Sequence, residues 1–246
     1  MTVCTDCTAL EQPYQPFLTR ASYRGNPQAQ AAAVAYRTKH YGYFEGFGDR
    51  SLNPHRPEHY VESTTFMGLP IKLHKTVIPP LRCVEKAILA NCSGPCKPNP
   101  AYPGECDIPH KEFPYTPRRL SGLRTYNSFK GGQVSNHVYG IALDIDPSKN
   151  SCCGCVGKWK ENPLCKSTKY TQAYQRMAMP MCWVEQFEKY GFYWLGHDRL
   201  ADTMHFAFLG DPAKVIECKS PSRIGNWVLL AGAAFLAYTL LTKKKK

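Results

Sequence analysis

The chain has 246 residues, of which 43% are hydrophobic and 20% charged, a composition that excludes an intrinsically disordered protein and suits one sizeable core. Its 31 Lys and Arg against 19 Asp and Glu give a net charge of +12, and the lysines at 243–246 supply four of these charges. The charge favours an anionic environment. No sequence signature of DNA or RNA binding accompanies it, so we expect no nucleic-acid partner.

Twelve cysteines are present, and several lie in tight groups. Cys4 and Cys7 form one group, Cys92 and Cys96 another, and residues 152–155 contain three more. This density is typical of disulfides formed in an oxidising compartment, although spacing alone does not assign the pairs. A structural zinc site is the alternative, because Cys4 and Cys7 have the spacing of a zinc knuckle.

The first half of the chain shows few regular patterns. Residues 1–65 are rich in Tyr, Pro, Gly and Arg, and we treat them as an N-terminal extension of unknown role. Within them an alanine-rich stretch, residues 28–36, predicts a short helix. Residues 67–80 predict a strand that ends in a turn. From Leu81 the apolar residues follow helical spacing, which predicts a helix that reaches Cys92.

The second half alternates strands with loop-like and Cys-rich segments. Period-two alternation predicts strands at residues 141–146 and 204–209, and a further strand is expected at 121–126. A Cys-rich insertion at 146–180 precedes residues 181–192, MCWVEQFEKYGF, which predict an amphipathic helix that ends at Gly191. This order of elements predicts an α+β fold over residues 66–210, with a small antiparallel sheet and flanking helices.

Polar residues interrupt the apolar pattern of SNHVYGIALDID, residues 135–146. Alternation places Asp144 on the face of the strand that points away from the packed side. His137 lies an odd number of residues from Asp144, so a bend is needed before both side chains can reach the same side of the sheet. Gly140 is the residue placed to supply that bend.

The strand MHFAFL, residues 204–209, repeats this pattern with His205 on its polar face. If the two strands are neighbours, His137, Asp144 and His205 converge on one side of the sheet. Two imidazoles and a carboxylate are good zinc ligands, and three protein ligands leave a fourth position open for water. The alternative for any single histidine is a hydrogen-bonded structural role.

Three motifs resemble those of the zinc D,D-carboxypeptidase and L-alanyl-D-glutamate endopeptidase family, which cleaves peptidoglycan stem peptides. SNHVYGIALD, residues 135–144, is similar to the SxHxxGxAxD motif of this family. DTMHF, residues 202–206, resembles its second motif, in which an acidic residue lies three positions before the last zinc-binding histidine. SGLRTY, residues 121–126, resembles its SGYRS segment. The motifs occur in the order of the family, and the resemblance covers about residues 66–210.

The resemblance implies a role for each residue. His137, Asp144 and His205 correspond to the zinc ligands, and Asp202 corresponds to the general base that takes a proton from the attacking water. The resemblance also implies that Arg124 binds a substrate carboxylate or the developing oxyanion and that Ser135 bonds a ligand or the substrate. Asp146 precedes Pro147 at the end of the predicted strand and is expected from that position to be a turn residue. The chain departs from the family at Ala207, where many members have glutamate.

Residues 224–242 contain no charged side chain. At about 1.5 Å per residue, these nineteen residues span roughly 28 Å, near the thickness of a bilayer core. We expect a single transmembrane helix here, with a linker at 211–223 before it and a basic tail at 243–246 after it. The first twenty residues lack the apolar core of a signal peptide. The chain is therefore expected to be a single-pass membrane protein with a C-terminal anchor.

Together these observations predict a membrane-anchored zinc metallopeptidase that hydrolyses peptidoglycan stem peptides or cross-links. The DxxH form of the second motif favours the L-alanyl-D-glutamate endopeptidase type, and a D,D-carboxypeptidase is the other option. A wall-cutting domain with a tail anchor also suits a phage or virion lytic protein carried in a membrane. The alternative is a non-catalytic zinc-containing binding or signalling module, because the Hedgehog signalling domain resembles this family and has a similar ligand set.

Overall fold

The computed structural model describes residues 4, 7–10, 25–127, 134–155 and 157–215. The chain divides into two compact units. The larger unit, Cys7–Ile216, contains every helix and strand among the described residues. The smaller unit combines Met1–Asp6 with Glu217–Lys246, and Cys4 is its one described residue.

The predicted transmembrane segment, residues 224–242, and the basic tail after it lie outside the described residues. In the part of the chain that the structure describes, no helix combines the length and the apolar character needed to cross a bilayer. The predicted linker, 211–223, is described only as far as residue 215, where it contains a short 3-10 turn at Pro212–Lys214.

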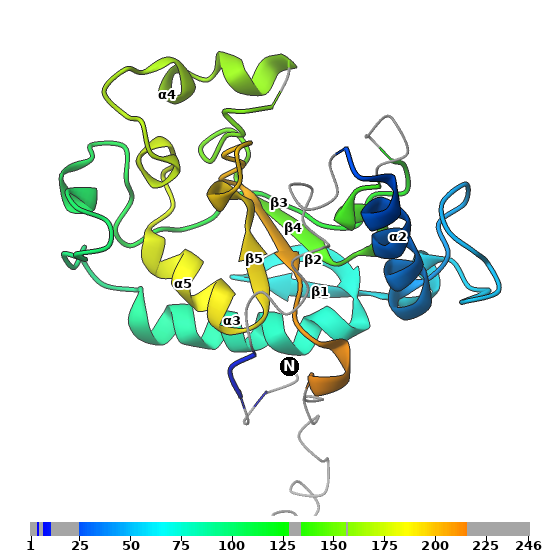
Figure 1. Ribbon diagram of the computed structural model, residues 1–246. Coiled ribbons are helices and arrows are strands. Elements are labelled where there is room, and N and C mark those ends of the chain that lie inside the picture. The colour runs from blue at the N-terminus through cyan, green and yellow to red at the C-terminus, as the bar shows by residue number, and fades with distance from the viewer. Residues whose placement is uncertain (1–3, 5–6, 11–24, 128–133, 156, 216–246) are drawn as a thin grey trace, which may run out of the picture. The chain divides into compact units, whose positions relative to one another are not determined.

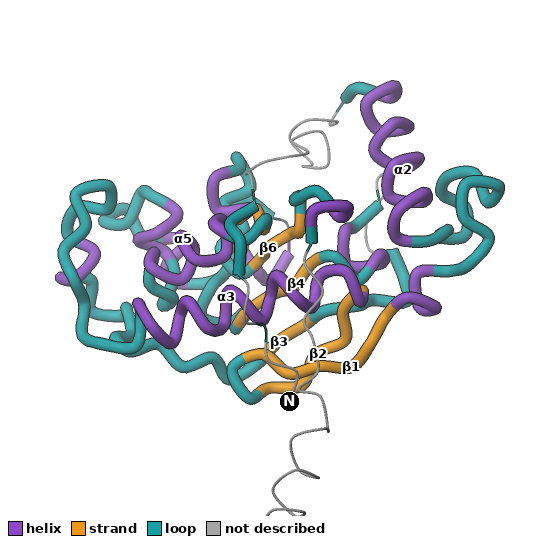
Figure 2. The backbone as a smooth tube through the Cα atoms, turned by 90° about the horizontal axis from the view of Figure 1, so that it is seen from below, coloured by secondary structure: helices purple, strands orange, loops and turns teal. Residues whose placement is uncertain are grey.

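Two antiparallel sheets form the β part of the large unit (Figure 1). The larger has the strand order β3-β4-β6-β5, with β3 at Leu120–Ser121, β4 at Ala142–Ile145, β5 at Phe192–Trp194 and β6 at His205–Phe208. The smaller is a hairpin of β1, Val61–Phe66, and β2, Leu69–His74. Its strand β2 lies beside the start of the larger sheet (Figure 2), where the Leu123 N–H donates to the Lys72 carbonyl over 2.9 Å.

Four α-helices accompany the sheets in the described residues: α2 at Pro27–Tyr41, α3 at Ile78–Asn91, α4 at Pro163–Lys166 and α5 at Met181–Lys189. Helix α5 lies beside α3, as both views show. The α+β class with small antiparallel sheets and flanking helices is therefore confirmed, as are helices close to those predicted from 28–36, from Leu81 and from 181–192.

Local sequence explains where these helices begin and end. Asn26 caps α2, because its side-chain oxygen accepts the Ala29 N–H over 3.0 Å. Pro27 is the first residue of the helix, a position whose N–H makes no intrahelical bond, so the N–H that proline lacks is not missed there. Gly191, with φ +88°, follows the C-terminal end of α5 and takes a backbone conformation that favours glycine. The helical spacing in α3 holds with one exception, since Leu89 is 56% exposed.

Aromatic side chains fill the core between α5 and the sheet. Phe187 of α5 stacks on Phe206 of β6 with ring centroids 4.0 Å apart, and it meets Phe192 of β5 edge to face at 5.3 Å. Phe66 of β1 packs edge to face on Trp183 of α5. All five rings are fully buried. The core therefore packs α5 against β6, the strand that begins with His205.

The register of the larger sheet brings the predicted polar residues together. Asp144 of β4 is the Cα partner of His205 in β6 and of Ser121 in β3. Residues directly opposite in an antiparallel pair have Cβ atoms about 4.5–5.5 Å apart. The expectation that the two motif-bearing strands are neighbours is therefore confirmed.

Two expectations from the alternation pattern need correction. Asp144 was expected to face away from the packed side of its strand, but it is buried, as is every residue of β4. The polar face is covered because the turn that carries His137 and the side chain of Arg124 both lie over it. The strand expected at 121–126 is also shorter, since β3 ends at Ser121.

The predicted start of the domain at residue 66 falls on the last residue of β1. The hairpin pairs β1 with β2 along its whole length, so strand pairing crosses this boundary. Helix α2 also contacts the predicted domain, where buried Arg37 donates through Nη1 to the Val134 carbonyl over 3.1 Å. The compact unit, Cys7–Ile216, thus includes described parts of the segment treated as an extension.

The described cysteines are disulfide-bonded. Five bridges are present among them: Cys7–Cys83, Cys92–Cys182, Cys96–Cys106, Cys152–Cys155 and Cys153–Cys165. Cys4 and Cys7 are both in disulfides, so the zinc-knuckle alternative is wrong for this pair. The Cys92–Cys182 bridge joins the end of α3 to α5 and so supports the core described above.

Candidate metal centre

The first histidine of the site lies on a 3-10 turn, Asn136–Tyr139, directly before β4. Ser135 caps this turn, since its hydroxyl accepts the His137 N–H over 3.3 Å. Gly140 ends the turn with φ +67°, and a Cβ at this position would lie 2.9 Å from the backbone nitrogen of His74. The bend expected at Gly140 is therefore present, and glycine is required there by both conformation and space.

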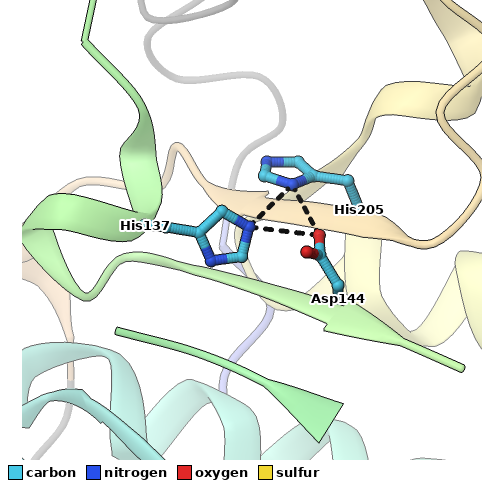
Figure 3. Close-up of side chains that lie close together, drawn as sticks. All are labelled: His137, Asp144 and His205. Carbon is cyan, nitrogen blue, oxygen red and sulfur yellow. Dashed lines mark hydrogen bonds and ion pairs between the residues drawn. The ribbon is translucent and has the colours of Figure 1, made fainter. Parts of the chain in front are cut away.

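Three side chains converge in the larger sheet, as Figure 3 shows. His137 Nε2 lies 3.1 Å from Asp144 Oδ1 and 3.1 Å from His205 Nδ1, and His205 Nδ1 lies 2.9 Å from the same Asp144 oxygen. All three residues are buried. The structure thus brings together the three residues that the sequence predicts as metal ligands.

The tautomer of His137 leaves a lone pair directed at this cluster. Its Nδ1 lies 2.7 Å from the Gly122 carbonyl, which can only accept, so Nδ1 carries the proton. In the neutral ring, Nε2 is then an acceptor that faces the carboxylate of Asp144. Acceptors this close repel one another unless a cation or a proton lies between them.

The donor set fits zinc. Zinc bonds of about 2.0–2.2 Å to nitrogen and oxygen in a tetrahedral arrangement separate the ligand atoms by about 3.3–3.5 Å. The ligand atoms of His137, Asp144 and His205 are 2.9–3.1 Å apart, so an adjustment of a few tenths of an ångström suffices. The Gly122 carbonyl also orients His137, as the outer partners of metal-binding histidines usually do.

Electrostatics favours the ionised form of Asp144. Burial by itself raises its pKa, but the His137 and His205 rings, when protonated, outweigh burial through charge and hydrogen bonds and hold the pKa well below its ordinary value. Arg124 donates through Nη2 to the second carboxylate oxygen of Asp144 over 2.7 Å. A carboxylate that stays ionised when buried is suited to hold a divalent cation.

Asp202 lies just before β6, with its N–H donating to the Leu195 carbonyl over 3.2 Å. Its Oδ1 is buried and has no hydrogen-bond partner among the described residues. Burial raises the pKa of Asp202 to about 7, against the opposing effect of His205, and Asp144 raises it further. Asp202 is therefore close enough to the cluster to respond to its charges, as expected for a residue in the turn before the strand.

The remaining predicted residues have defined contacts. Arg124 is 28% exposed at its side chain and is attached to the cluster twice, through Asp144 and through its own N–H, which donates to the His137 carbonyl over 3.1 Å. Ser135 is buried as the cap of the 3-10 turn. Asp146 lies outside the cluster and binds the backbone N–H groups of Arg118 and Arg119, which agrees with a turn residue.

Sequence reasoning missed the role of Gly122. A Cβ on this residue would clash with the Lys72 carbonyl and lie 2.8 Å from Ile71, so the chain approaches β2 here as closely as only glycine allows. The glycine in SGLRTY is a signal of such a close approach. The carbonyl that orients His137 belongs to the backbone, so no pattern of side chains in the sequence indicates its role. Ala207, at which the chain departs from the glutamate of many family members, pairs with Ala142 of β4 and is buried.

Comparison with known proteins identifies a relationship for one part of the chain. Residues 130–208, about a third of the 246 residues, match the family model described as D-alanyl-D-alanine carboxypeptidase. The matched segment contains the three clustered residues and Asp202, and it begins after Arg124. No curated protein and no solved structure shows a significant match. The family match confirms the resemblance to zinc peptidases that the motifs indicate.

Proposed function

We propose that this chain is a zinc-dependent peptidase that hydrolyses peptidoglycan stem peptides or cross-links. The observation that carries the proposal is the pairing of two features at one place. A buried three-residue donor set fits zinc and leaves a fourth position open, and the half-buried Asp202 lies beside it with a buried Oδ1 that has no hydrogen-bond partner among the described residues. A purely structural zinc site is usually closed by four protein ligands, and it has no use for an unpartnered carboxyl oxygen beside it.

His137, Asp144 and His205 would hold the zinc. When bound, zinc supplies a Lewis acid and an acidified water. Asp202 would then serve as the proton carrier, because a carboxylate beside the metal can take a proton from water and return it to the leaving amine. Its buried Oδ1 is the atom without a described partner and is therefore available for that proton.

Arg124 is suited to bind the anionic part of the substrate. One of its nitrogens, Nη2, donates to Asp144, and the planar guanidinium carries further N–H groups at its partly exposed end. These groups can donate to a substrate carboxylate or to the oxyanion that develops at the scissile carbonyl. The bond to Asp144 also sets the distance between the substrate anchor and the metal ligands.

The DxxH motif leads us to favour the L-alanyl-D-glutamate endopeptidase type over the D,D-carboxypeptidase type. We further propose that residues 224–242 anchor the chain in a membrane by its C-terminal end. A lytic protein carried in a virion membrane is one setting that suits this arrangement. These finer assignments rest on the motif and on the uncharged length of the segment.

Digestion of purified muropeptides by the zinc-loaded full-length chain tests the proposal, with products identified by mass. Cleavage between L-alanine and D-glutamate supports the endopeptidase type, and release of terminal D-alanine supports the carboxypeptidase type. Asp202→Asn should retain zinc and lose about a hundredfold or more in kcat. Asp198→Asn, a neighbouring carboxyl held by the Tyr193 hydroxyl, should stay within a few fold of the parent. A parent that binds wall fragments but never cuts them would favour the Hedgehog-like binding module.

A further inference from the structure

One turn of the Cys-rich insertion, residues 151–155, packs against residues 200–203, the loop that carries Asp202. Cys152 and Asp202 form an isolated antiparallel bridge between the two segments. Four hydrogen bonds join them: Cys153 N–H to the Ala201 carbonyl (3.3 Å), Gly154 N–H to the Leu200 carbonyl (2.6 Å), and Thr203 N–H and hydroxyl to the Ser151 carbonyl (3.3 and 3.0 Å). The backbone on both sides of Asp202 is thus held by this turn.

A disulfide between Cys152 and Cys155 closes the turn directly behind Asp202. The two sulfur atoms and a carboxylate oxygen of Asp202 lie within 4.8 Å of one another. Cys152 is 1% exposed, so this bridge is packed into the structure at the end nearest the loop. Since both cysteines are in the disulfide, the group acts as a covalent support and not as a set of metal ligands.

Ala201 shows that the loop needs such support. Its φ is +46°, a left-handed conformation that is unfavourable for any residue with a side chain and persists only where surrounding contacts impose it. Its N–H donates to the Asp198 carbonyl over 2.8 Å, and its carbonyl accepts from Cys153 in the turn. Gly154 approaches so closely that a Cβ would lie 2.6 Å from Leu200 Cα, which leaves the loop little room to relax toward the turn.

The size of the closed loop points to a local role for this bridge. The entropic stabilisation from a disulfide grows with the number of residues that it encloses. Cys152 and Cys155 are three positions apart in the sequence, whereas the cysteines of the other described bridges are 10, 12, 76 and 90 positions apart. The Cys152–Cys155 bridge therefore contributes least to global stability through chain entropy, and its main effect is on the segment that it touches.

We propose that the Cys152–Cys155 disulfide is a positioning element that holds the Leu200–Thr203 backbone and so fixes the position of the Asp202 carboxyl relative to the metal cluster. The inference rests on the proposed role of Asp202 as proton carrier. Its loss should lower the rate of the chemical step and leave zinc and substrate binding largely intact, because the ligands and Arg124 lie on other elements.

The test compares the full-length parent with Cys152→Ser/Cys155→Ser, a double substitution that removes the bridge without leaving a free thiol. Cys96→Ser/Cys106→Ser is the matched control, since it removes another short bridge that has no described contact with the loop. We expect kcat on muropeptides to fall about tenfold or more in the first variant, with KM within about twofold and zinc content unchanged. The control should keep the parent kcat. Equal loss of kcat in both variants, or loss of kcat only in step with zinc, would overturn the inference.

A second measurement tests, independently of activity, whether the bridge holds the Leu200–Thr203 backbone. Hydrogen exchange of the Asp202 and Thr203 amides, which donate to Leu195 and Ser151, should be about tenfold faster without the Cys152–Cys155 bridge and unchanged in the control. Equal exchange in the two variants would refute the positioning role whatever the kinetics show. If the zinc-loaded parent cuts no muropeptide, the proposed function fails, and the exchange rates still decide whether the bridge holds the loop.

Discussion

At the scale of single residues, the site depends on which atom of each side chain is free to bind. The proton on His137 Nδ1 is committed to the Gly122 carbonyl, so the other nitrogen is directed at the cluster. Asp144 contacts both histidines through Oδ1 and accepts from Arg124 through Oδ2. These commitments give the three donors fixed orientations before a metal arrives, which reduces the cost of assembling the site.

The first prediction concerns the metal ligands. His205→Ala should reduce bound zinc from one ion per chain to a small fraction, because two remaining ligands seldom hold zinc against competition from water. Elemental analysis after dialysis measures the change. His197→Ala is the control, since His197 pairs with Glu188 over 2.7 Å outside the cluster and should leave the zinc content at one. Undiminished zinc in His205→Ala would show that the assignment of the site is wrong.

The second prediction follows from the pKa of Asp202, which is raised from its ordinary value of 3.8 to about 7. Between these values the unfolded carboxyl ionises while the folded one stays protonated, so the folded state binds more protons and the free energy of unfolding falls as pH rises. The Asn side chain does not ionise, so it makes no such contribution. Metal-free Asp202→Asn should therefore be more stable than the parent at pH 8, by about 2–4 kcal/mol, and nearly equal to it at pH 4.

Urea unfolding of the metal-free proteins at both pH values measures this difference. Asp49→Asn serves as the control, because the exposed Asp49 accepts the Ser51 N–H and its pKa is lowered, chiefly by that hydrogen bond. It should show no gain in stability at pH 8. A parent and an Asp202→Asn variant that differ equally at pH 4 and pH 8 would contradict the raised pKa.

At the scale of elements, the site is formed where a short turn meets a central strand. The 3-10 turn brings His137 over β4, and β4 pairs with β3 on one side and β6 on the other. Asp144 therefore has Ser121 as one cross-strand neighbour and His205 as the other. The geometry of the cluster depends on two junctions, the bend at Gly140 and the pairing of β4 with β6.

The third prediction tests the bend. Gly140→Ala places a methyl group 2.9 Å from His74 N and 3.0 Å from a Val61 methyl, in a backbone conformation with φ +67°. The turn must shift, so we expect a loss of about 1–3 kcal/mol in unfolding free energy and a fall of about tenfold or more in zinc affinity. Denaturant titration and competition with a chelating dye measure the two effects.

Gly104→Ala separates backbone strain from crowding. Gly104 has a similar φ of +71°, and a Cβ there would have no heavy atom within 4 Å. This control should lose about 1 kcal/mol from strain alone and keep the parent zinc affinity. If both substitutions reduced zinc affinity equally, the bend would not be what positions His137.

At the scale of the whole molecule, the peptidase-like site belongs to a unit larger than the matched segment. The Cys7–Ile216 unit includes α2 and the β1–β2 hairpin, which precede residue 130. The hairpin supplies the surfaces that Gly122 and Gly140 approach, and α2 reaches the segment before the 3-10 turn through Arg37. The N-terminal elements therefore support the site even though they carry none of its proposed ligands.

The fourth prediction concerns the proposed anchor. Removal of residues 225–246 should move the chain from the membrane fraction to the supernatant, because the uncharged segment is lost. Zinc content and muropeptide cleavage should be unchanged, since every residue assigned to the site lies before residue 210. Removal of 243–246 alone is the control and should leave the chain in the membrane fraction. Sedimentation of expressed membranes followed by immunoblotting distinguishes these outcomes.

Much of the fold follows from local patterns. Helices α3 and α5 are long enough for their apolar spacing to be recognised, and the α+β class follows from the order of elements. Strands β1 and β5 could not be recognised, because β1 is mostly exposed polar sequence and β5 has only three residues. Disulfide connectivity was equally out of reach, since two of the five described bridges join cysteines 76 and 90 positions apart that only the folded chain brings together.

The sequence by itself determined the chemistry of the candidate site: His137, Asp144 and His205 as a donor set, Asp202 as the nearby acid, and Gly140 as the bend between them. Residue types and strand alternation were enough for the donor set and the bend, and the resemblance of DTMHF to the zinc peptidase motif supplied the role of Asp202. The tertiary structure decided what spacing cannot encode, namely the burial of Asp144, the carbonyl that orients His137 and the disulfide-closed turn behind Asp202. Each of these depends on contacts between segments far apart in the chain, and such contacts are determined by packing and strand pairing of the whole unit.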